Sequence, residues 1–509
     1  MRFKNLIPLL YIYLIIAEVI MFNIIVATDK NRGIAKDGNL PWPHNQADMK
    51  HFVNLTTGNP PPGKINAVVM GRKTWESIDS RFLPLKKRLN VVLSRNSANI
   101  ANIQALIYHN FKDAIQSLSS NIAVHEIFVI GGQEIYEIAI NDPRCKSIYI
   151  SEMPDYKNLG NCDKHFPEIP KWFALQSQIP AEKSTDPVFK QYNSLFDLHS
   201  SEYQYLNALN DILVNGVPIN DRTGIGTLAC FSTHMKFPIK VLNPDAAPAE
   251  LRYRVPIMTT KTLFHRGVFE ELIFFLQGKT NVKPLQDKGV HIWDGNTSRE
   301  FLDLHGLKNY SEGETGPFYG FQWNYFGAEY IAEQNEIWLD NNNGVNQLEE
   351  CIRLLKTDPY SRRIVLSAWN PVDLPKMCLP PCHMVYNFCV MPPAPGAKPT
   401  LHCAMFQRSG DMFLGVPFNI YSTALLTIFM SRAANMLPGS ISLTVTNAHI
   451  YKNHIDQVRT QLQRYPYKYP VLQIKKEINT LQDMRNLEFT DCELTEYNKH
   501  PAIKAEMAV

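Results

Sequence analysis

The chain has 509 residues and a formal net charge of +3, and its charges are not gathered into a lysine or arginine tract. Such a distribution argues against an arm dedicated to nucleic-acid binding. Nine cysteines, odd in number and irregularly spaced, are typical of a reduced intracellular protein rather than a disulfide-stabilised secreted one. The length alone predicts about three domains, although two larger ones also account for it.

Residues 1–20 are hard to interpret from their pattern. Two basic residues precede a short apolar run, which has the length and polarity of a secretory signal core and is too short for a membrane span. No small-x-small cleavage pattern stands out near Ala17. We expect an extended or misassigned start and a cytoplasmic protein, with targeting or membrane attachment as the alternative.

A β-type apolar run begins at Phe22 and opens into a glycine-punctuated loop that ends in Pro41-Trp42-Pro43. This pattern predicts a strand followed by a flap. Asp48 comes shortly afterwards, among apolar neighbours. An isolated carboxylate in such a pocket can hold a cationic heterocycle.

Further strand-like runs end in residues that suit a phosphate or a closely approaching ligand. Gly-Gly alone is weak evidence, since most such pairs are only turns, but a helix start can bind phosphate and glycines let a ligand approach the backbone. The residues concerned are Gly71, Arg72, Lys73, Thr74, Ser94, Arg95, Gly131 and Gly132.

In this order the motifs resemble dihydrofolate reductase over residues 21–197. The resemblance implies an α/β domain with a doubly wound, mostly parallel sheet and NADPH as cofactor. Asp48 would hold the pteridine and support its protonation at N5, Arg88 would pair with the glutamate tail of folate, and Ile25 would add a folate contact. The implied NADPH contacts are Ala27, Ile34, Leu40, Trp42, Gly71, Arg72, Lys73, Thr74, Ser94, Arg95, Gly131, Gly132 and Tyr136. The 2′-phosphate of NADPH explains why arginine is wanted there.

Farther along, Pro381-Cys382-His383 and Gln407-Arg408-Ser409 can place a thiol beside a guanidinium. The cation favours the thiolate and offers a planar fork to a phosphate, so Cys382 is a candidate covalent nucleophile. Turn-like segments supply further arginines that could clamp a phosphate, namely Arg222, Arg362 and Arg363. Cys378, Cys382 and His383 could also be read as half of a metal site. No second half has the required spacing, and we predict no metal.

Residues 198–509 resemble thymidylate synthase along their whole length, with matches that include Glu271-Leu-Ile-Phe-Phe-Leu, His291-Ile-Trp-Asp and Gly316-Pro-Phe-Tyr. The resemblance implies an α+β fold and a homodimer. It implies that Cys382 adds to C6 of deoxyuridylate (dUMP), which then takes a methylene group from 5,10-methylenetetrahydrofolate.

The same resemblance assigns the other site residues. Glu271 and Tyr319 would handle protons near the base, although Glu271 also opens a pattern that otherwise reads as a buried amphipathic helix with the acid at its solvated edge. The implied dUMP contacts are Arg222, Arg362, Arg363, His383, Gln407, Arg408, Ser409, Asp411, Asn419, His449 and Tyr451, with Arg362 and Arg363 reaching in from the partner subunit. The implied folate contacts are Trp293, Asp411 and Val509.

Together the two resemblances indicate the fused reductase–synthase family of protozoa and plants. Two alternatives stay open: only one half is active, or the chain keeps the fold as a regulatory subunit that binds RNA or a partner. Departures from the usual residues stand at Ala35, Ser151, Asn324, Asn387 and Asn447. We expect them to affect rates and loop motion, not the reaction.

The boundaries of three segments also follow from the pattern. The run from Val188 should end the first sheet, and a helix should start near Ser201, which leaves a linker of only a few residues at 197–200. The proline-rich insert from Met391 predicts a surface hairpin between strands.

Overall fold

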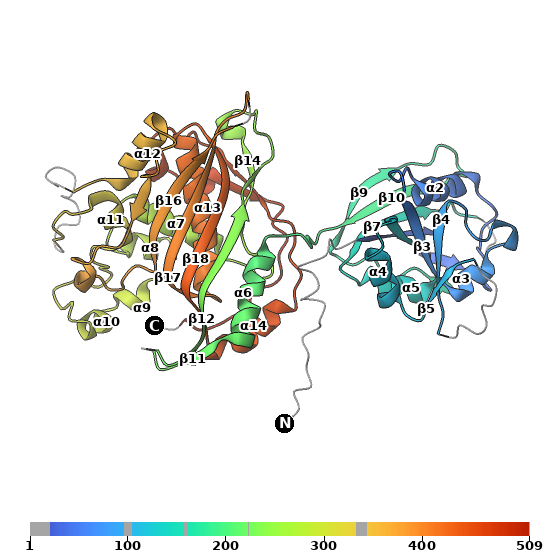
Figure 1. Cartoon of the computed structure of the whole chain (residues 1–509), viewed down its shortest axis with the longest axis horizontal. Helices are drawn as coiled ribbons and strands as arrows, with labels where there is room; N and C mark the ends of the chain where they lie inside the picture. The colour runs from blue at the N-terminus through green and yellow to red at the C-terminus, as the bar shows by residue number, and fades with distance from the viewer. Residues whose placement is uncertain are drawn as a thin grey trace. The chain divides into compact units, whose positions relative to one another are not determined.

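The computed structural model of the protein describes residues 21–95, 104–156, 161–221, 223–331, 344–393 and 395–507. The chain forms two compact units, and the boundary in the sequence falls between Leu198 and His199 (Figure 1). Each unit is described by itself.

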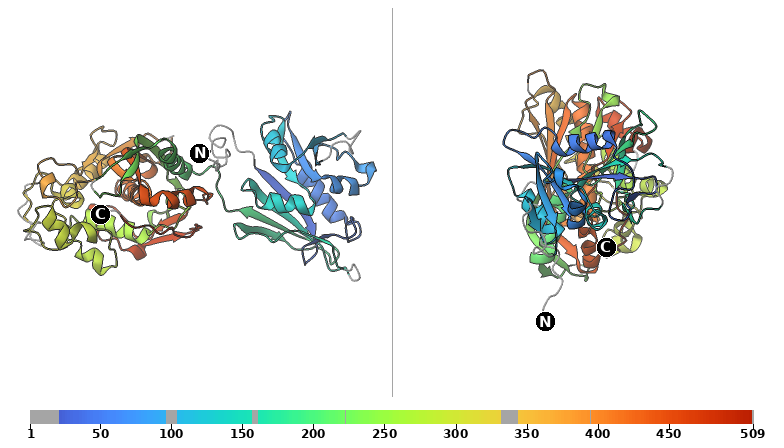
Figure 2. Two further views of the ribbon diagram at one scale, coloured as in Figure 1. Left: turned by 90° about the horizontal axis from the view of Figure 1, so that it is seen from below. Right: turned by 90° about the vertical axis from the view of Figure 1, so that its right-hand side faces the viewer.

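The N-terminal unit is built on an eight-stranded sheet in the order β5-β4-β3-β6-β1-β7-β10-β9. Its strands are β1 (Phe22–Thr28), β3 (Ile65–Gly71), β4 (Arg88–Leu93), β5 (Leu106–Tyr108), β6 (Val124–Val129), β7 (Cys145–Glu152), β9 (Phe173–Ile179) and β10 (Val188–Ser194). Neighbours pair in parallel except at β10, which is antiparallel to both β7 and β9. Figure 2 shows the β9–β10 hairpin as two green arrows side by side. The predicted mostly parallel sheet is confirmed.

Helices cover both faces of this sheet: α2 (Gln46–Thr57), α3 (Arg72–Ser77), α4 (Phe111–Ser119) and α5 (Gln133–Ile140). Successive strand residues point to opposite faces. Ile24 therefore joins the core beneath α4 and α5, whereas Ile25 joins the core beneath α2 and α3. A small ribbon of β2 (Gly33–Ala35) and β8 (Lys164–His165) lies apart from the main sheet.

The C-terminal unit is built on a six-stranded sheet in the order β11-β12-β18-β17-β16-β15. Its strands are β11 (Val217–Ile219), β12 (Thr227–Pro238), β15 (Val365–Ser367), β16 (His383–Met391), β17 (Thr400–Asp411) and β18 (Leu437–Tyr451). Only β17 and β18 pair in parallel, and the long buried helix α13 (Gly415–Ala433) connects them. The proline-rich segment joins the antiparallel strands β16 and β17, as the hairpin prediction requires.

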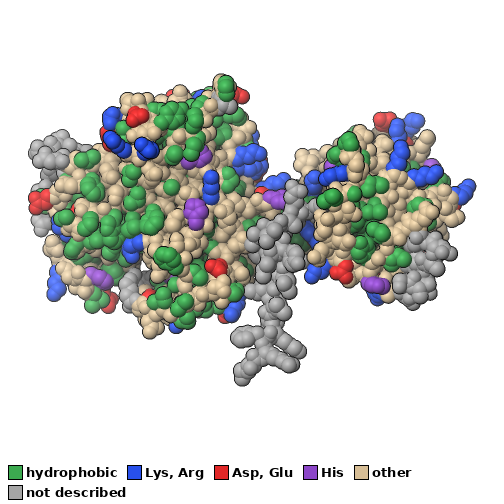
Figure 3. Space-filling model, viewed as in Figure 1, with side chains coloured by type: hydrophobic (Ala, Val, Ile, Leu, Met, Phe, Trp, Pro, Cys, Tyr) green, Lys and Arg blue, Asp and Glu red, His purple; other side chains and the backbone are tan. Residues whose placement is uncertain are grey.

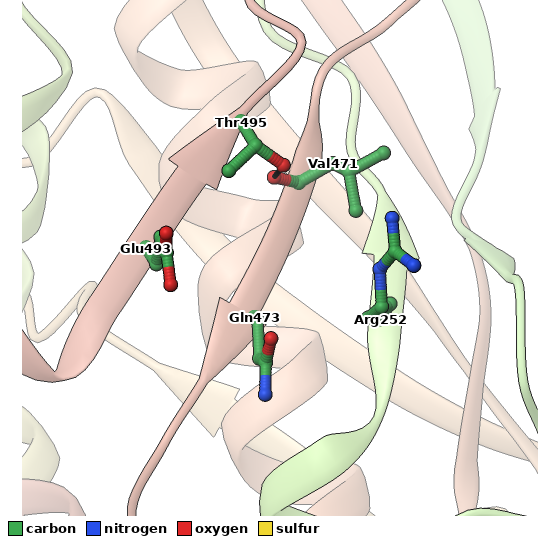
Figure 4. A pocket seen from close by; sticks show the side chains of 5 residues that line it. All are labelled: Arg252, Val471, Gln473, Glu493 and Thr495. Carbon is green, nitrogen blue, oxygen red and sulfur yellow. Dashed lines mark hydrogen bonds between the residues drawn. The ribbon is translucent and has the colours of Figure 1, made fainter.

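Four further strands form a second sheet in this unit: β13 (Lys240–Val241), β14 (Arg252–Arg254), β19 (Val471–Ile474) and β20 (Cys492–Thr495). A groove of about 190 Å³ lies on this sheet. Figure 4 shows the side chains that line it, which are Arg252, Val471, Gln473, Glu493 and Thr495. None of the predicted site residues lies in this groove. The other helices are α6 (Glu202–Asn215), α7 (His265–Leu276), α8 (Lys283–Asp287), α9 (Asp294–Thr297), α10 (Arg299–Leu304), α11 (Tyr319–Tyr325), α12 (Gln347–Thr357), α14 (Ile455–Leu462) and α15 (Leu481–Arg485).

The structure excludes the alternative interpretation of Glu271. That alternative placed Glu271 at the solvated edge of an amphipathic helix, but every residue from Gly267 to Leu276 is buried. Helices α11, α13 and α15 all pack against α7. A helix enclosed on all sides has no polar face, so Glu271 lies inside the unit.

All nine cysteines are free thiols. Within the described ranges, no helix has the length and apolar character needed to cross a membrane. The apolar segment 1–20 lies outside these ranges.

Candidate active sites

The carboxyl group of Asp48 marks the site in the N-terminal unit. It lies in the first turn of α2, which Asn45 caps by accepting a hydrogen bond from the backbone N–H of Asp48 at 3.0 Å. Asp48 is only 9% exposed, and this burial raises its pKa, although a hydrogen bond with Ser151 and the nearby His44 oppose the shift. Asp48 therefore holds a proton more readily than an ordinary aspartate.

Neighbouring strands bring other predicted residues toward Asp48. Ala27 of β1 is opposite Ser151 of β7, and the Tyr136 hydroxyl donates to the Ile25 carbonyl at 2.9 Å. Burial and the charge of Asp48 raise the pKa of Tyr136, so its phenol stays a neutral donor. One wall of the site is thus built from β1, β7 and α5.

The carboxyl ends of β3 and β6 form a second part of this site. The Gly71 N–H donates to the Gly131 carbonyl at 2.7 Å. Gly131 has φ +118°, and a Cβ there would lie 3.2 Å from the Tyr136 hydroxyl; a Cβ on Gly132 would lie 3.1 Å from Thr74 Oγ1. Both positions thus favour glycine. Arg72 and Lys73, which follow Gly71, begin helix α3.

The remaining predicted residues of this unit differ in exposure. Ser94, directly after β4, is buried, and so are Ile34 and Trp42, whereas Leu40 is exposed and the Arg95 side chain is 91% exposed. The Arg95 guanidinium pairs with Glu134, in the first turn of the helix that Gly132 caps, with nitrogen and oxygen 3.7 Å apart.

Arg88 lies at the other end of α2 from Asp48. Its guanidinium donates to Thr56 Oγ1 at 2.8 Å and covers the ring of Phe52. Because Asp48 and Thr56 are eight residues apart on one helix, the two charged groups are separated by roughly 12 Å along the axis. This spacing suits an elongated ligand with a basic head and an acidic tail.

In the C-terminal unit, strand pairing places Cys382 beside Arg408. The Arg408 N–H donates to the Cys382 carbonyl at 2.9 Å, and Nη2 of Arg408 lies 3.8 Å from the Cys382 sulfur. Bonds to the carbonyls of Pro380 and Pro381 hold the guanidinium in place. The thiol thus faces a fixed cation, as predicted from the sequence.

Tyr319 contacts the backbone of Cys382, and His383 contacts Tyr319. The Tyr319 hydroxyl accepts the backbone N–H of Cys382 at 2.7 Å, and the His383 ring stacks on Tyr319 with centroids 4.4 Å apart. His383 Nδ1 and the Tyr386 hydroxyl form a hydrogen bond of 2.8 Å. Burial lowers the pKa of His383 to about 3, so its imidazole is neutral.

Other predicted contacts converge at the same end of the sheet. Asp411 of β17 is opposite His449 of β18, and Tyr451 follows two residues later. Gln407 Nε2 donates to Asn419 Oδ1 at 3.2 Å, but the buried Oε1 of Gln407 has no hydrogen-bond partner within the described ranges. A buried acceptor without a partner is costly and is suited to receive a donor from a ligand.

The carboxyl group of Glu271 is buried in this site. Trp293 Nε1 donates to Glu271 Oε1 at 2.8 Å. Burial raises the pKa of Glu271 to about 7, although the Trp293 bond opposes the shift. Glu271 can therefore both take and give a proton near neutral pH.

Glu271→Gln should change how stability depends on pH. A carboxyl with a raised folded-state pKa binds its proton more tightly in the folded than in the unfolded protein, so its contribution is largest below about pH 4.5 and is lost as the pH rises toward about 7. The full effect is on the order of 3 kcal/mol. Melting temperatures of the C-terminal unit at pH 5 and pH 8 should differ less in Glu271→Gln than in the parent. An equal difference in both proteins would show that the pKa of Glu271 is not raised in the folded protein.

Two predicted residues of this site, Arg222 and Val509, lie outside the described ranges. Among the described neighbours, Asp221 accepts from the Thr223 hydroxyl at 2.6 Å and from the Gly226 N–H at 2.8 Å. Arg362 and Arg363 are exposed in the turn between α12 and β15. The next residue, Ile364, accepts from the N–H of Phe388, so it lies six residues along β16 from Cys382, roughly 20 Å away.

Lys261, which lies next to this site, was not among the predicted site residues. Its ammonium donates to the Phe413 carbonyl and lies 3.7 Å from the centre of the Phe413 ring. Burial lowers the pKa of Lys261 to about 7, while the charges of Asp411 and Glu202 oppose the shift. The available signal was a lysine directly after the apolar and hydroxyl run 255–260.

The five departures occupy structured positions. Ser151 retains a hydroxyl that reaches Asp48, Asn447 Oδ1 lies 3.0 Å from His449 Nδ1, and Asn387 donates to the Ile364 carbonyl at 3.1 Å. Ala35 lies in β2, and Asn324 contacts a guanidinium supplied by Arg485. Within the described ranges, no cluster of histidine, cysteine and acidic residues has a geometry that could hold a metal.

Comparison with known proteins decides the family. The dihydrofolate reductase family profile matches residues 21–195, and the thymidylate synthase family profile matches residues 203–509. The bifunctional dihydrofolate reductase-thymidylate synthase 2 of Arabidopsis thaliana is 39% identical over 96% of this chain and 88% of its own length. The Leishmania major and Zea mays bifunctional enzymes are each 38% identical over 96% of this chain, covering 95% and 97% of their lengths.

The chain belongs to the bifunctional dihydrofolate reductase–thymidylate synthase family. It is an enzyme with both activities, the reductase in its N-terminal unit and the synthase in its C-terminal unit. This outcome confirms the reading of the sequence as a fusion and disfavours a chain with one working half.

Proposed function

We propose that the reductase unit reduces dihydrofolate with NADPH and that the synthase unit converts dUMP and 5,10-methylenetetrahydrofolate into thymidylate and dihydrofolate. The observation that carries the proposal is the Cys382 thiol 3.8 Å from Arg408, with the buried carboxyl of Glu271 in the same unit. Steady-state assays of each reaction on the purified chain test it. Absence of either turnover would contradict that half of the proposal.

The residues at the carboxyl ends of β3 and β6 fit NADPH. Gly131 and Gly132 leave no side chain beside Tyr136 and Thr74, so a ligand can approach the backbone there, and Arg72, Lys73 and Thr74 at the start of α3 are suited to bind its phosphates. When bound, NADPH supplies a hydride. The protein's own part is to hold dihydrofolate between Asp48 and Arg88 and to keep a proton near the pteridine.

In the synthase unit, the predicted site residues have distinct roles. The Cys382 thiolate attacks the base, and Arg408 both favours the thiolate and binds the phosphate of dUMP. The open acceptor of Gln407 and the amide of Asn419 can read the uracil edge. Glu271 moves protons at the base, while Trp293 and Asp411 meet the folate.

We also propose that the synthase unit works as a homodimer. Arg362 and Arg363 lie roughly 20 Å along the sheet from the cysteine of their own chain, too far to share one nucleotide with it. The outward face of the six-stranded sheet exposes Val365, Met391 and Phe406, and hydrophobic side chains gather over β16 and β17 in Figure 3. An exposed apolar sheet face of this kind is suited to a second copy.

Subunit complementation tests this arrangement. A Cys382→Ser chain and an Arg362→Ala/Arg363→Ala chain should each lack synthase activity, whereas mixed dimers should regain up to half of the parent activity. One site of the mixed dimer then receives an intact cysteine from one chain and intact arginines from the other. Reductase activity in each sample measures the protein present. Mixed dimers that form but stay inactive would show that the arginines act within their own chain.

A cytoplasmic location is proposed as well. Nine free thiols support it, because such a chain suits a reducing compartment. Fractionation of cells expressing the full chain tests it, and recovery in a membrane or secreted fraction would contradict it.

A further inference from the structure

Asn324 and Arg485 meet at the carboxyl end of α7, the helix that carries Glu271. A helix end leaves carbonyl groups without intrahelical partners. Arg485 Nε donates to the Leu276 carbonyl at 3.0 Å, and Asn324 Nδ2 donates to the Phe275 carbonyl at 3.1 Å. A cation at this end also favours the helix dipole.

The two side chains are joined to each other and to a second helix. Arg485 of α15 donates from Nη2 to Oδ1 of Asn324, a residue of α11, at 2.6 Å, and Asn324 Nδ2 also donates to the Gly320 carbonyl one turn earlier in α11 at 2.7 Å. Asn324 is only 2% exposed. Its amide therefore uses both donor hydrogens and its acceptor in one buried junction of α7, α11 and α15.

This junction is continuous with the catalytic groups. The ring of Phe275, whose carbonyl Asn324 binds, stacks on the ring of Tyr319 with centroids 4.9 Å apart. Tyr319 in turn accepts the backbone N–H of Cys382. Glu271 lies about one helical turn before Phe275 on α7.

We propose that Asn324 and Arg485 are positioning residues for the synthase reaction: they keep α7 and α11 in register so that Glu271 and Tyr319 stay aligned around Cys382. The inference rests on the proposed synthase function. It also gives the departure at position 324 a physical account, because the guanidinium in this junction comes from α15. Arginine suits position 485 better than lysine, since lysine lacks the planar fork that bonds to Leu276 and Asn324 together.

The test compares Arg485→Met, Arg485→Lys and Asn324→Ala in the full-length chain, with Arg353→Met as control. Arg353 is an exposed helix arginine that pairs with Glu350. Arg485→Met should lower synthase kcat by roughly 10 to 100-fold, the scale of a small misalignment, with the KM for dUMP within about threefold of the parent. Reductase turnover of the same sample should not change, and Arg485→Lys should recover part of the loss.

The pH profile provides a second measure. A looser junction admits water to Glu271, which lessens the burial that raises its pKa. The Glu271 limb of the kcat profile should therefore move to lower pH in Arg485→Met and stay in place in Arg353→Met. In the cycle with Asn324→Ala, the double variant should lose little more than the worse single variant.

Amide hydrogen exchange in residues 271–276 measures the junction without any turnover, so it separates this inference from the proposed function. Exchange should be faster in Arg485→Met than in the parent. A lower melting temperature with unchanged kcat, pH profile and α7 exchange would overturn the inference, as would fully additive losses in the double variant. If Arg485→Met fails to fold, the same comparisons on Arg485→Lys decide the question.

Discussion

Cys382→Ser should remove thymidylate formation, by roughly 10⁴ to 10⁶-fold, the scale on which loss of a catalytic nucleophile acts. A hydroxyl at neutral pH lacks the nucleophilicity of a thiolate, and Arg408 cannot compensate because it only stabilises an anion that serine does not form. Reductase turnover on the same chain should remain at the parent level. Both rates are measured on one preparation.

Cys378→Ser is the matched control for this experiment. Cys378 lies four residues before the nucleophile, is buried, and has a pKa raised to about 12 by that burial. Its thiol is therefore protonated and inert, and the variant should keep synthase activity. Thymidylate formation near the parent rate in Cys382→Ser would contradict covalent catalysis by this residue.

The neighbourhood of Cys382 was predictable because its geometry follows from strand pairing. Strands β16 and β17 are antiparallel and are joined by a single loop. Residues that precede and follow this loop by similar numbers of positions therefore lie side by side. Cys382 and Arg408 are such a pair. Asp411 and His449 converge by a different route, because β17 and β18 pair in parallel after the crossover helix α13.

Properties that depend on distant packing were not predictable. The run Glu271-Leu-Ile-Phe-Phe-Leu has a helical period, but only the later helices α11, α13 and α15 decide that no side of it meets water. For the same reason Arg485 could not be linked to Asn324, which precedes it by 161 residues. A local pattern predicts whether a segment is a helix or a strand, but the burial of that element depends on the rest of the chain.

The N-terminal unit shows the same division. The apolar runs predicted strands whose ends suit a phosphate or a closely approaching ligand, and the family resemblance implied the parallel sheet; in the structure Gly71 and Gly131 are hydrogen-bonded to each other at such strand ends. The bond from Tyr136 to the Ile25 carbonyl had no local signal. It depends on β1 lying next to β6 in the sheet.

Asp48→Asn should lower reductase turnover at neutral pH by roughly 10² to 10⁴-fold, the usual worth of a positioned acid or base. Asparagine preserves the shape of the side chain but cannot support protonation of the substrate. In the parent, burial raises the pKa of Asp48, so its protonated fraction falls as the pH rises through that raised value. The variant has no such group. Its residual rate should therefore rise as the pH falls, because protons must then come from solvent.

Asp113→Asn is the control, since Asp113 lies in the first turn of α4 and is exposed. It should keep full reductase activity, and synthase turnover should be unchanged in both variants because Asp48 belongs to the other unit. Asp48→Glu should recover part of the rate, since it restores an ionisable carboxyl at a slightly displaced position. Unchanged reductase turnover of Asp48→Asn at neutral pH would mean that protonation does not depend on this carboxyl, and the acidic group would have to be sought elsewhere in the unit.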